Sequence, residues 1–175
     1  EDRTKLLETL SEAAEPINLK VIPAKDIGSV TAAIAELVRD KDPEWGNQKS
    51  VAAWQHPLIE SLELPDALAE QGVPVFFSDV NESEGQNLRQ HIIDSYIGIT
   101  SADFCMADTA TLVMRTRPGQ ARTVSLLPSI HIAVIELDQI IADLKELYAL
   151  LKWDPEMSKE GVTNCMTFIS GPSKT

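Results

Sequence analysis

Hydrophobic residues in the first half of the chain form two alternating patterns: short apolar runs, and stretches with hydrophobic residues at helical spacing. The helical spacing predicts helices over residues 3–14, 30–38, 58–71 (in two pieces around Pro65) and about 85–95. The apolar or alternating runs predict strands over residues 17–22, 50–54 and 73–77. Because parallel strands need a crossover connection, usually a helix, this alternation predicts a mostly parallel sheet covered by helices.

Possible capping residues mark the ends of two predicted helices. Asp26 or Ser29 precedes the hydrophobic stripe of residues 30–38, where a side-chain oxygen can accept a hydrogen bond from a backbone N–H. In the next helical stretch, Asp66 can cap the second piece. Gly72 follows that piece at the place where a C-terminal cap is expected.

The second half of the chain is richer in predicted strands. Residues 98–117 lack helical periodicity and contain many Thr, Val and Ile residues, which favours two strands joined by a turn. Further strands are predicted over residues 122–127, 130–136 and 165–170. Before the last strand, Asp138 is predicted to cap a helix that continues to Leu151. The chain as a whole is therefore expected to be an α/β protein.

Length and charge narrow the possible classes. A chain of 175 residues with 43% hydrophobic residues can form a single domain, 1–175, with a core that needs neither metal nor disulfide. The net charge of −12 disfavours nucleic-acid binding and membrane-surface roles, because such a surface repels phosphates and anionic lipids. A locally basic pocket for a small anion remains compatible with this charge. No apolar run approaches the roughly 20 residues of a membrane span.

The two cysteines, Cys105 and Cys165, have no CxxC spacing and imply no disulfide scaffold. Two free thiols fit a reducing cytosol, and the charged start of the chain lacks a signal-peptide core, so we expect a cytoplasmic protein. So few cysteines also predict that the chain carries no iron–sulfur cluster of its own. Neither an HExxH metal motif nor a GxGxxG dinucleotide motif is present, so neither a metal site nor independent NAD-linked dehydrogenation is predicted.

Residues 98–113 combine polar side chains with a stretch apolar enough to be buried. The polar members are Thr100, Ser101, Asp103, Asp108, Thr109 and Thr111. Because buried hydroxyls and carboxylates need hydrogen bonds, these residues either fasten tight turns or line a pocket. Asp103 and Asp108 are five positions apart and would point to opposite faces of a regular strand, which disfavours a paired acid and base unless the chain bends at Ala107.

Two later segments contain further ligand-binding candidates. His131 alternates with Ile130 and Ile132, so it faces away from them; it is either a satisfied core or edge histidine or part of a site. The last predicted strand runs into a turn that exposes backbone N–H groups and carries Gly171, Ser173 and Lys174. Such a turn can hold an anion, although an ordinary exit from a strand has the same composition.

Three motifs together resemble those of the LUD (lactate utilization) family. They are GITSAD…ADTATL within residues 98–112, SLLP…HIAV within residues 125–134, and ISGPSKT at residues 169–175. Ala110 departs from the family, which often has glycine there. The last motif of the family normally continues into a further strand or two, so we expect the domain to lack its C-terminal strand or strands.

The resemblance implies a Rossmann-like α/β fold similar to the ribose-phosphate isomerase and CoA-transferase superfamily. It also implies a cluster-free subunit or accessory protein of an L-lactate oxidation system. Iron–sulfur partner subunits would handle the electrons, so the chain would not be active alone.

Two alternatives to this role remain. One is an enzyme or binding protein for a phosphorylated sugar or a CoA-type anion, with a site near Thr100, Ser101, Asp103 and Gly171. The other is a pure binding module whose acidic surface docks a basic partner.

Overall fold

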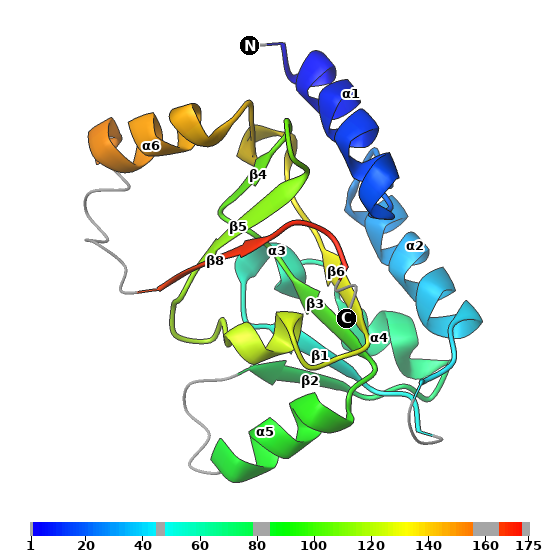
Figure 1. The fold of residues 1–175 in the computed structure, drawn as a ribbon. Helices are drawn as coiled ribbons and strands as arrows, with labels where there is room; N and C mark the ends of the chain where they lie inside the picture. Colours follow the sequence, from blue (N-terminus) through cyan, green and yellow to red (C-terminus); the bar gives the residue numbers. More distant parts are fainter. Residues whose placement is uncertain (1, 45–47, 79–84, 156–164, 173–175) are drawn as a thin grey trace. The chain divides into compact units, whose positions relative to one another are not determined.

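A computed structural model describes residues 2–44, 48–78, 85–155 and 165–172 (Figure 1). The chain divides into two compact units. The parallel-sheet unit comprises Ala24–Ser101 and Arg117–Val134. The mixed-sheet unit comprises Glu1–Pro23, Ala102–Thr116 and Ile135–Thr175. Both units draw on segments far apart in the sequence, and the expectation of one domain over residues 1–175 stays a prediction.

The parallel-sheet unit is built on a sheet in which every described strand runs parallel to its neighbour, in the order β2-β1-β3-β6. The strands are β1 (Val51–Trp54), β2 (Val75–Ser78), β3 (Ile97–Thr100) and β6 (Ile130–Ala133). Val51 of β1 pairs with Val75 on one side and Ile97 on the other, and Ile97 pairs with Ile130. The predicted parallel sheet is therefore confirmed.

Helices precede or connect these strands, as the alternating pattern predicts. α2 (Ile27–Asp40) precedes β1, and the connections contain α3 (Pro57–Glu60), α4 (Leu64–Ala69), α5 (Gly85–Asp94) and the 3-10 helix η2 (Arg122–Ser125). The predicted break within residues 58–71 is confirmed, and Gly72 follows α4 with a left-handed φ of +66°. The cap prediction for Asp66 is wrong: Glu63 is the N-cap, and Asp66 lies in the first turn of α4.

One face of the parallel sheet packs into a hydrophobic core with α2 and α4. Alternate strand positions such as Val51, Ile97 and Ile99 are fully buried in the same cluster as Val38 of α2 and Leu68 of α4. Burying a side chain of this kind contributes about 1.5–3 kcal/mol relative to leaving it exposed. This face is therefore the hydrophobic support of the sheet, and the polar residues of the strands lie on the other face.

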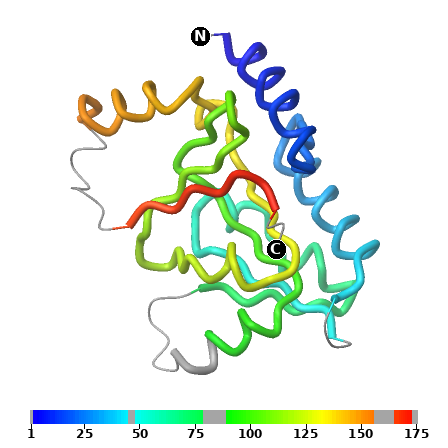
Figure 2. Tube along the Cα trace, viewed as in Figure 1, coloured from blue at the N-terminus to red at the C-terminus, as the bar shows by residue number. Residues whose placement is uncertain are grey.

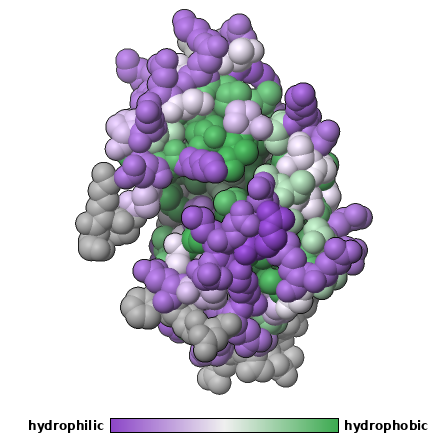
Figure 3. Space-filling model, turned by 90° about the vertical axis from the view of Figure 1, so that its right-hand side faces the viewer, coloured by the Kyte–Doolittle hydropathy of each residue, from purple (hydrophilic) through white to green (hydrophobic). Residues whose placement is uncertain are grey.

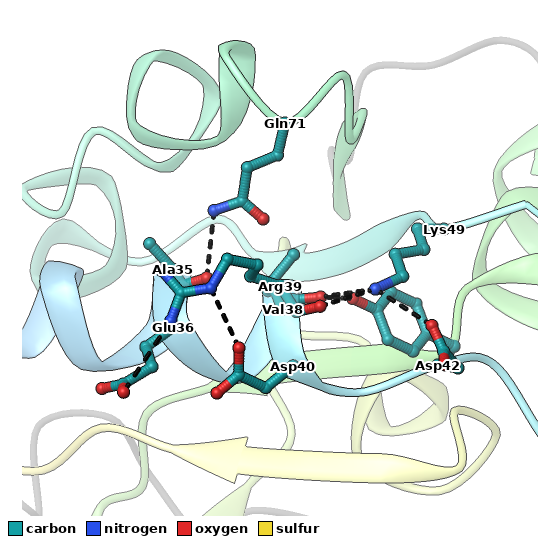
Figure 4. A network of polar contacts seen from close by, with 9 residues as sticks. Ala35, Glu36, Val38, Arg39, Asp40, Asp42, Lys49 and Gln71 are labelled. Carbon is teal, nitrogen blue, oxygen red and sulfur yellow. Dashed lines mark hydrogen bonds and ion pairs between the residues drawn. The ribbon is translucent and has the colours of Figure 1, made fainter.

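Side chains form capping hydrogen bonds at both ends of α2. Asp26 accepts a hydrogen bond from the Ser29 backbone N–H at 2.7 Å, and Ser29 Oγ accepts one from the Asp26 N–H at 3.1 Å, a reciprocal capping box. At the other end, Lys49 Nζ donates to the carbonyls of Val38 and Arg39 at 3.1 and 2.9 Å (Figure 4). A cation at a helix C-terminus also complements the helix dipole.

The mixed-sheet unit contains a smaller sheet with the strand order β7-β4-β5-β8. Its strands are β4 (Phe104–Met106), β5 (Thr111–Arg115), β7 (Ile140–Ile141) and β8 (Met166–Ile169). β4 and β5 form an antiparallel hairpin, β8 pairs antiparallel with β5, and β7 pairs parallel with β4. Figure 2 shows the red C-terminal strand running beside the hairpin, far from it in sequence.

Helices α1 (Arg3–Ala14) and α6 (Leu144–Trp153) and the 3-10 helices η1 (Glu15–Ile17) and η3 (Leu137–Gln139) complete this unit. Leu147 of α6 packs with Phe104, Met106, Val113 and Ile141 in the core. Residues 98–117 therefore supply three strands rather than the expected two, because β3 belongs to the parallel sheet and only β4 and β5 form the hairpin.

Two strand predictions are wrong. Residues 17–22 alternate between half-buried and exposed side chains, but η1 and a left-handed φ of 57° at Asn18 leave the backbone outside any described sheet. Residues 122–127 begin with η2 instead of a strand, and Ser125 Oγ donates back to the Arg122 carbonyl at 2.9 Å. In residues 17–22 the hydrophobic spacing reports which side chains are partly buried but not whether the backbone pairs, and in residues 122–127 it fails on both counts, since Leu126 and Leu127 are exposed.

The predicted helix after Asp138 begins later than expected. Ile140 and Ile141 form β7 and pair with Cys105 and Met106. Asp143 is the true N-cap, accepting hydrogen bonds from the next turn of α6 at 2.8 and 2.9 Å. Because β7 and α6 are both apolar on the side that faces the core, their side chains merge into one apparent helical stripe.

We predict a difference between two alanine-to-glycine substitutions in the hairpin turn. Ala107 and Ala110 are both fully buried, but only Ala110 has a positive φ, +47°. An alanine in the left-handed region is strained by about 1–2 kcal/mol, and glycine relieves this strain. Ala110→Gly should therefore lower the free energy of unfolding by about 1–2 kcal/mol less than Ala107→Gly does. Chemical denaturation of both variants measures this difference. Equal losses in the two variants would show that the turn is not strained.

Candidate functional site

The carboxyl edge of the parallel sheet is where an open α/β sheet is expected to bind a ligand. Strand β1 lies between β2, which follows it, and β3, which returns on its other side. The chain therefore reverses its direction of winding between β1 and β3, and ligands bind beyond the carboxyl ends of strands at such a switch point. In this sheet the switch point lies at Trp54 of β1 and Thr100 of β3.

A tight turn, residues 117–120, is fastened to this edge. The Gln120 N–H donates to the Arg117 carbonyl at 3.1 Å, and Gly119 has a φ of +75° that suits glycine at the third position of a type II turn. The Gly119 carbonyl accepts hydrogen bonds from the Gln55 N–H at 3.0 Å and from the Ser78 hydroxyl. The turn is thereby tied to the ends of both β1 and β2.

The chain after this turn lies directly on the polar face of the sheet. Trp54 Nε1 donates to the Ala121 carbonyl at 2.9 Å. A Cβ at Gly98 of β3 would lie only 1.8 Å from the Val124 carbonyl oxygen and 3.1 Å from Pro128. Only glycine permits this approach, so Gly98 allows residues 121–128 to cover β3.

Two of the sequence-predicted site residues meet on this face. Thr100 Oγ1 and His131 Nε2 are 2.8 Å apart, and His131 pairs in register with Gly98. Burial lowers the pKa of His131 to about 4, so the imidazole is neutral at physiological pH. Thr100 and the adjacent Ser101 are completely buried. The Thr100–His131 pair is therefore a neutral hydrogen-bonded pair that carries no charge to attract an anion.

In the mixed-sheet unit, Asp103 forms a buried ion pair. Its carboxylate accepts from the Arg115 backbone N–H at 2.6 Å and from Arg115 Nε at 3.1 Å, and both side chains are at least 94% buried. The Asp103 N–H donates to the Val113 carbonyl at 2.8 Å, extending the β4–β5 ladder. This carboxylate fastens the hairpin, and Arg115 is a partner that the sequence analysis missed.

The remaining hydroxyl candidates form a short hydrogen-bonded chain. Thr111 Oγ1 lies 2.7 Å from Ser170 Oγ and 2.9 Å from Thr109 Oγ1. Thr109 Oγ1 in turn donates to Asp108 at 3.0 Å. Gly171 follows with a φ of +82°, as a turn after a strand requires. Ser173 and Lys174 lie outside the described residues. The turn-fastening interpretation suits this group, because its polar atoms satisfy one another.

One further residue of interest escaped the sequence analysis. The side-chain Oε1 of Gln120 is buried and has no hydrogen-bond partner among the residues that the structure describes. Residue spacing gives no indication of this, because it predicts a strand that ends at residue 117 and another that begins at residue 122. The Arg-Pro-Gly-Gln sequence of residues 117–120 was the available signal, because Pro-Gly favours a type II turn.

Metal and membrane features are absent from the described part of the chain. No group of three or more His, Cys, Asp or Glu side chains there is arranged to hold a metal ion. Among the same residues, no helix has both the length and the apolar character needed to cross a bilayer. Burial raises the pKa of the Cys105 thiol to about 12, so this cysteine stays protonated at neutral pH.

We predict that His131 makes the protein less stable as pH falls below neutral. Its pKa is about 4 when folded but about 6.5 when unfolded, so the unfolded chain binds the proton more tightly. Between pH 8 and pH 5 the unfolding free energy should fall by on the order of 2 kcal/mol through this residue. His131→Gln should remove that part of the decline in urea denaturation. An identical pH dependence in the variant would contradict the assignment.

Comparisons with known proteins identify the family and the sequence relatives of the chain. A family model described as the LUD domain matches residues 7–175. Lactate utilization protein C of Halalkalibacterium halodurans is 28% identical over 171 residues, which covers 98% of this chain and 70% of that protein. Lactate utilization protein B of Bacillus subtilis is 30% identical over 86 residues, 49% of this chain and 18% of that protein. The chain spans between 43% and 70% of the length of the lactate utilization protein C relatives that it matches.

A solved structure supports the fold. The crystal structure of a DUF162 family protein from Deinococcus radiodurans matches 98% of this chain and 90% of its own, with a TM-score of 0.64 and 18% identity. At this identity the likeness concerns the fold alone, an α/β architecture with a parallel sheet flanked by helices. Since the family model covers all but the first six residues, the chain belongs to the LUD domain family.

Proposed function

We propose that the protein takes part in lactate utilization, as a cluster-free subunit or accessory protein of a cytoplasmic L-lactate oxidation system. The observation that carries this proposal is the match to lactate utilization protein C over 98% of the chain. Because that match includes both units, it extends over the parallel sheet and its carboxyl edge. The proposed role therefore concerns the whole described chain and not one motif.

The cysteines support the cluster-free part of the proposal. Iron–sulfur clusters are commonly held by four Cys thiolates, and the sequence has only Cys105 and Cys165. The raised pKa of Cys105 disfavours the thiolate form that a cluster needs. A redox role would then depend on partner proteins that carry the clusters.

Partner proteins are supported by a second relative and by surface charge. A stretch similar to half of this chain occurs within the longer lactate utilization protein B of Bacillus subtilis. Figure 3 shows hydrophilic residues over much of the visible face, and the chain has a net charge of −12. We therefore propose that iron–sulfur subunits bind this acidic protein at least partly through charge, and that their binding weakens as the salt concentration rises.

The alternative is a protein for a phosphorylated sugar or CoA-type anion, as in the ribose-phosphate isomerase and CoA-transferase superfamily. It is favoured by one observation, the switch point between β1 and β3, which is the usual ligand position in open α/β sheets. Fold analogy alone assigns no substrate, because one fold hosts many functions. We therefore place this alternative second.

Deleting the gene for the complete protein in its own organism should abolish growth on L-lactate and leave growth on pyruvate intact. Pyruvate is the product of lactate oxidation, so it bypasses the proposed step. Growth rates on the two carbon sources measure the effect, and a plasmid copy of the gene is the control that should restore growth on L-lactate. Unchanged growth on L-lactate, or an equal loss on pyruvate, would contradict the proposal.

The subunit role has its own readout. Affinity purification of the complete protein from lactate-grown cells should recover iron–sulfur proteins, in amounts that fall as salt is raised in the wash. Recovery of the protein without iron would argue for the second candidate.

A further inference from the structure

Helix α6 exposes two large aromatic side chains to solvent. Leu147 is 1% exposed and attaches the helix to the core of the mixed-sheet unit, beside β4 (Figure 1). Away from that contact, Tyr148 and Trp153 are 67% and 73% exposed. Aromatic side chains contribute most when they are buried, and they are enriched at the centres of protein–protein contacts. The solvent side of α6 is therefore a candidate contact surface.

The middle of this solvent side is a small residue. Ala149 is exposed, and residues three and four positions away lie on the same face of a helix. Before Ala149 these residues are Lys145 and Glu146, and after it they are Lys152 and Trp153; all four are exposed. We call these five residues the α6 face. Because its central residue is small, the axis of a second helix can approach closely while the larger side chains interlock on both sides.

The cations of the α6 face form no ion pair with the residues that the structure describes. Lys145 and Lys152 are absent from every ion pair found there. Lys152 Nζ lies 4.8 Å from the centre of the Trp153 ring, so a cation and a ring share one end of the face. At the other end, Glu146 Oε2 accepts a hydrogen bond from the Ala142 N–H at 2.6 Å, which leaves Oε1 for another donor.

This pattern is complementary to itself when two copies of α6 lie antiparallel. If Ala149 of each copy lies at the two-fold axis, residues equally far before and after Ala149 meet. Lys152 of one copy then lies opposite Glu146 of the other, and Lys145 lies opposite Trp153. A shift of the axis by half a residue would put Lys145 opposite Lys152, where like charges repel. The charges therefore favour a single register.

We propose that the protein associates with a second copy of itself through an antiparallel pair of α6 helices. The symmetry makes each contact twice, which gives two Glu146–Lys152 ion pairs and two Lys145–Trp153 contacts. The ten residues of α6 extend over about 15 Å, so the contact is smaller than a standard interface. The net charge of −12 on each copy also opposes association. The dimer is therefore weak, with a dissociation constant on the order of 100 µM. This inference does not depend on the proposed function.

Sedimentation equilibrium of the complete protein between about 10 µM and 1 mM tests the proposal. The average mass of the wild type should rise with concentration from that of a monomer towards twice that value. Lys152→Glu replaces both ion pairs with like-charge pairs, so it should raise the dissociation constant about tenfold or more. The matched control is Lys20→Glu, which makes the same change in net charge at an exposed residue outside the helices. This control should dimerise like the wild type.

Exchanging the two charges tests the register. The double variant Glu146→Lys/Lys152→Glu recreates both ion pairs with reversed signs, so it should regain most of the affinity that Lys152→Glu loses. Ala149→Arg places a long side chain at the axis and should prevent dimerisation, although an exposed arginine is well tolerated in a helix. Thermal unfolding at low concentration checks that each variant is folded, because the double variant loses the Glu146 bond to Ala142.

Three results would overturn the proposal. The first is a wild type that stays monomeric over the whole range, even if changes in the α6 face reduce the recovery of iron–sulfur proteins; the face then belongs to a different partner. The second is wild-type dimerisation of Lys152→Glu and Ala149→Arg. The third is a folded double variant that remains monomeric. If the double variant does not fold, the comparison of Lys152→Glu and Ala149→Arg with Lys20→Glu still decides.

Discussion

The close approach of the Val124 carbonyl to Gly98 is the constraint on which the parallel-sheet unit depends. A Cβ at Gly98 would lie 1.8 Å from that oxygen, so no other residue permits the two backbones to meet without a shift. The approach lets residues 121–128 cover the polar face of β3, the face on which burial lowers the pKa of His131. It also places the preceding turn, with Gln120, at the edge of the sheet.

The two units satisfy their buried polar groups differently. In the mixed-sheet unit, Asp103 pairs with Arg115, and Thr111 bonds to neighbouring hydroxyls, so these side chains fasten a hairpin. In the parallel-sheet unit, Gln120 keeps an unpaired acceptor at the switch point. A group that the fold satisfies contributes to stability, whereas one that it leaves unsatisfied costs folding free energy. The carboxyl edge of the parallel sheet is the stronger candidate for binding because it lies at the switch point between β1 and β3.

Sequence patterns predicted features that depend on local interactions and missed those that depend on distant ones. The N-cap of α2, expected at Asp26 or Ser29 and found at Asp26, and the buried strands of the parallel sheet follow from neighbouring residues. The alternation of residues 17–22 was a correct signal of burial, yet strand pairing needs a partner that sequence spacing does not reveal. The candidate residues divided in the same way. Thr100 and His131 meet across two strands, while Gln120 went unnoticed because its importance arises only from the turn that holds it.

Residue-resolved hydrogen exchange of a Gly98→Ala variant tests the central claim most directly. In the wild type, the Trp54 indole N–H and the Gln55 backbone N–H are bonded to residues 119–121, so both should exchange slowly. The added methyl group should displace the covering segment, so that both N–H groups lose protection while those of α2 keep theirs. If both groups in the variant stay as protected as in the wild type, the Gly98 contact does not hold the segment and the account is wrong.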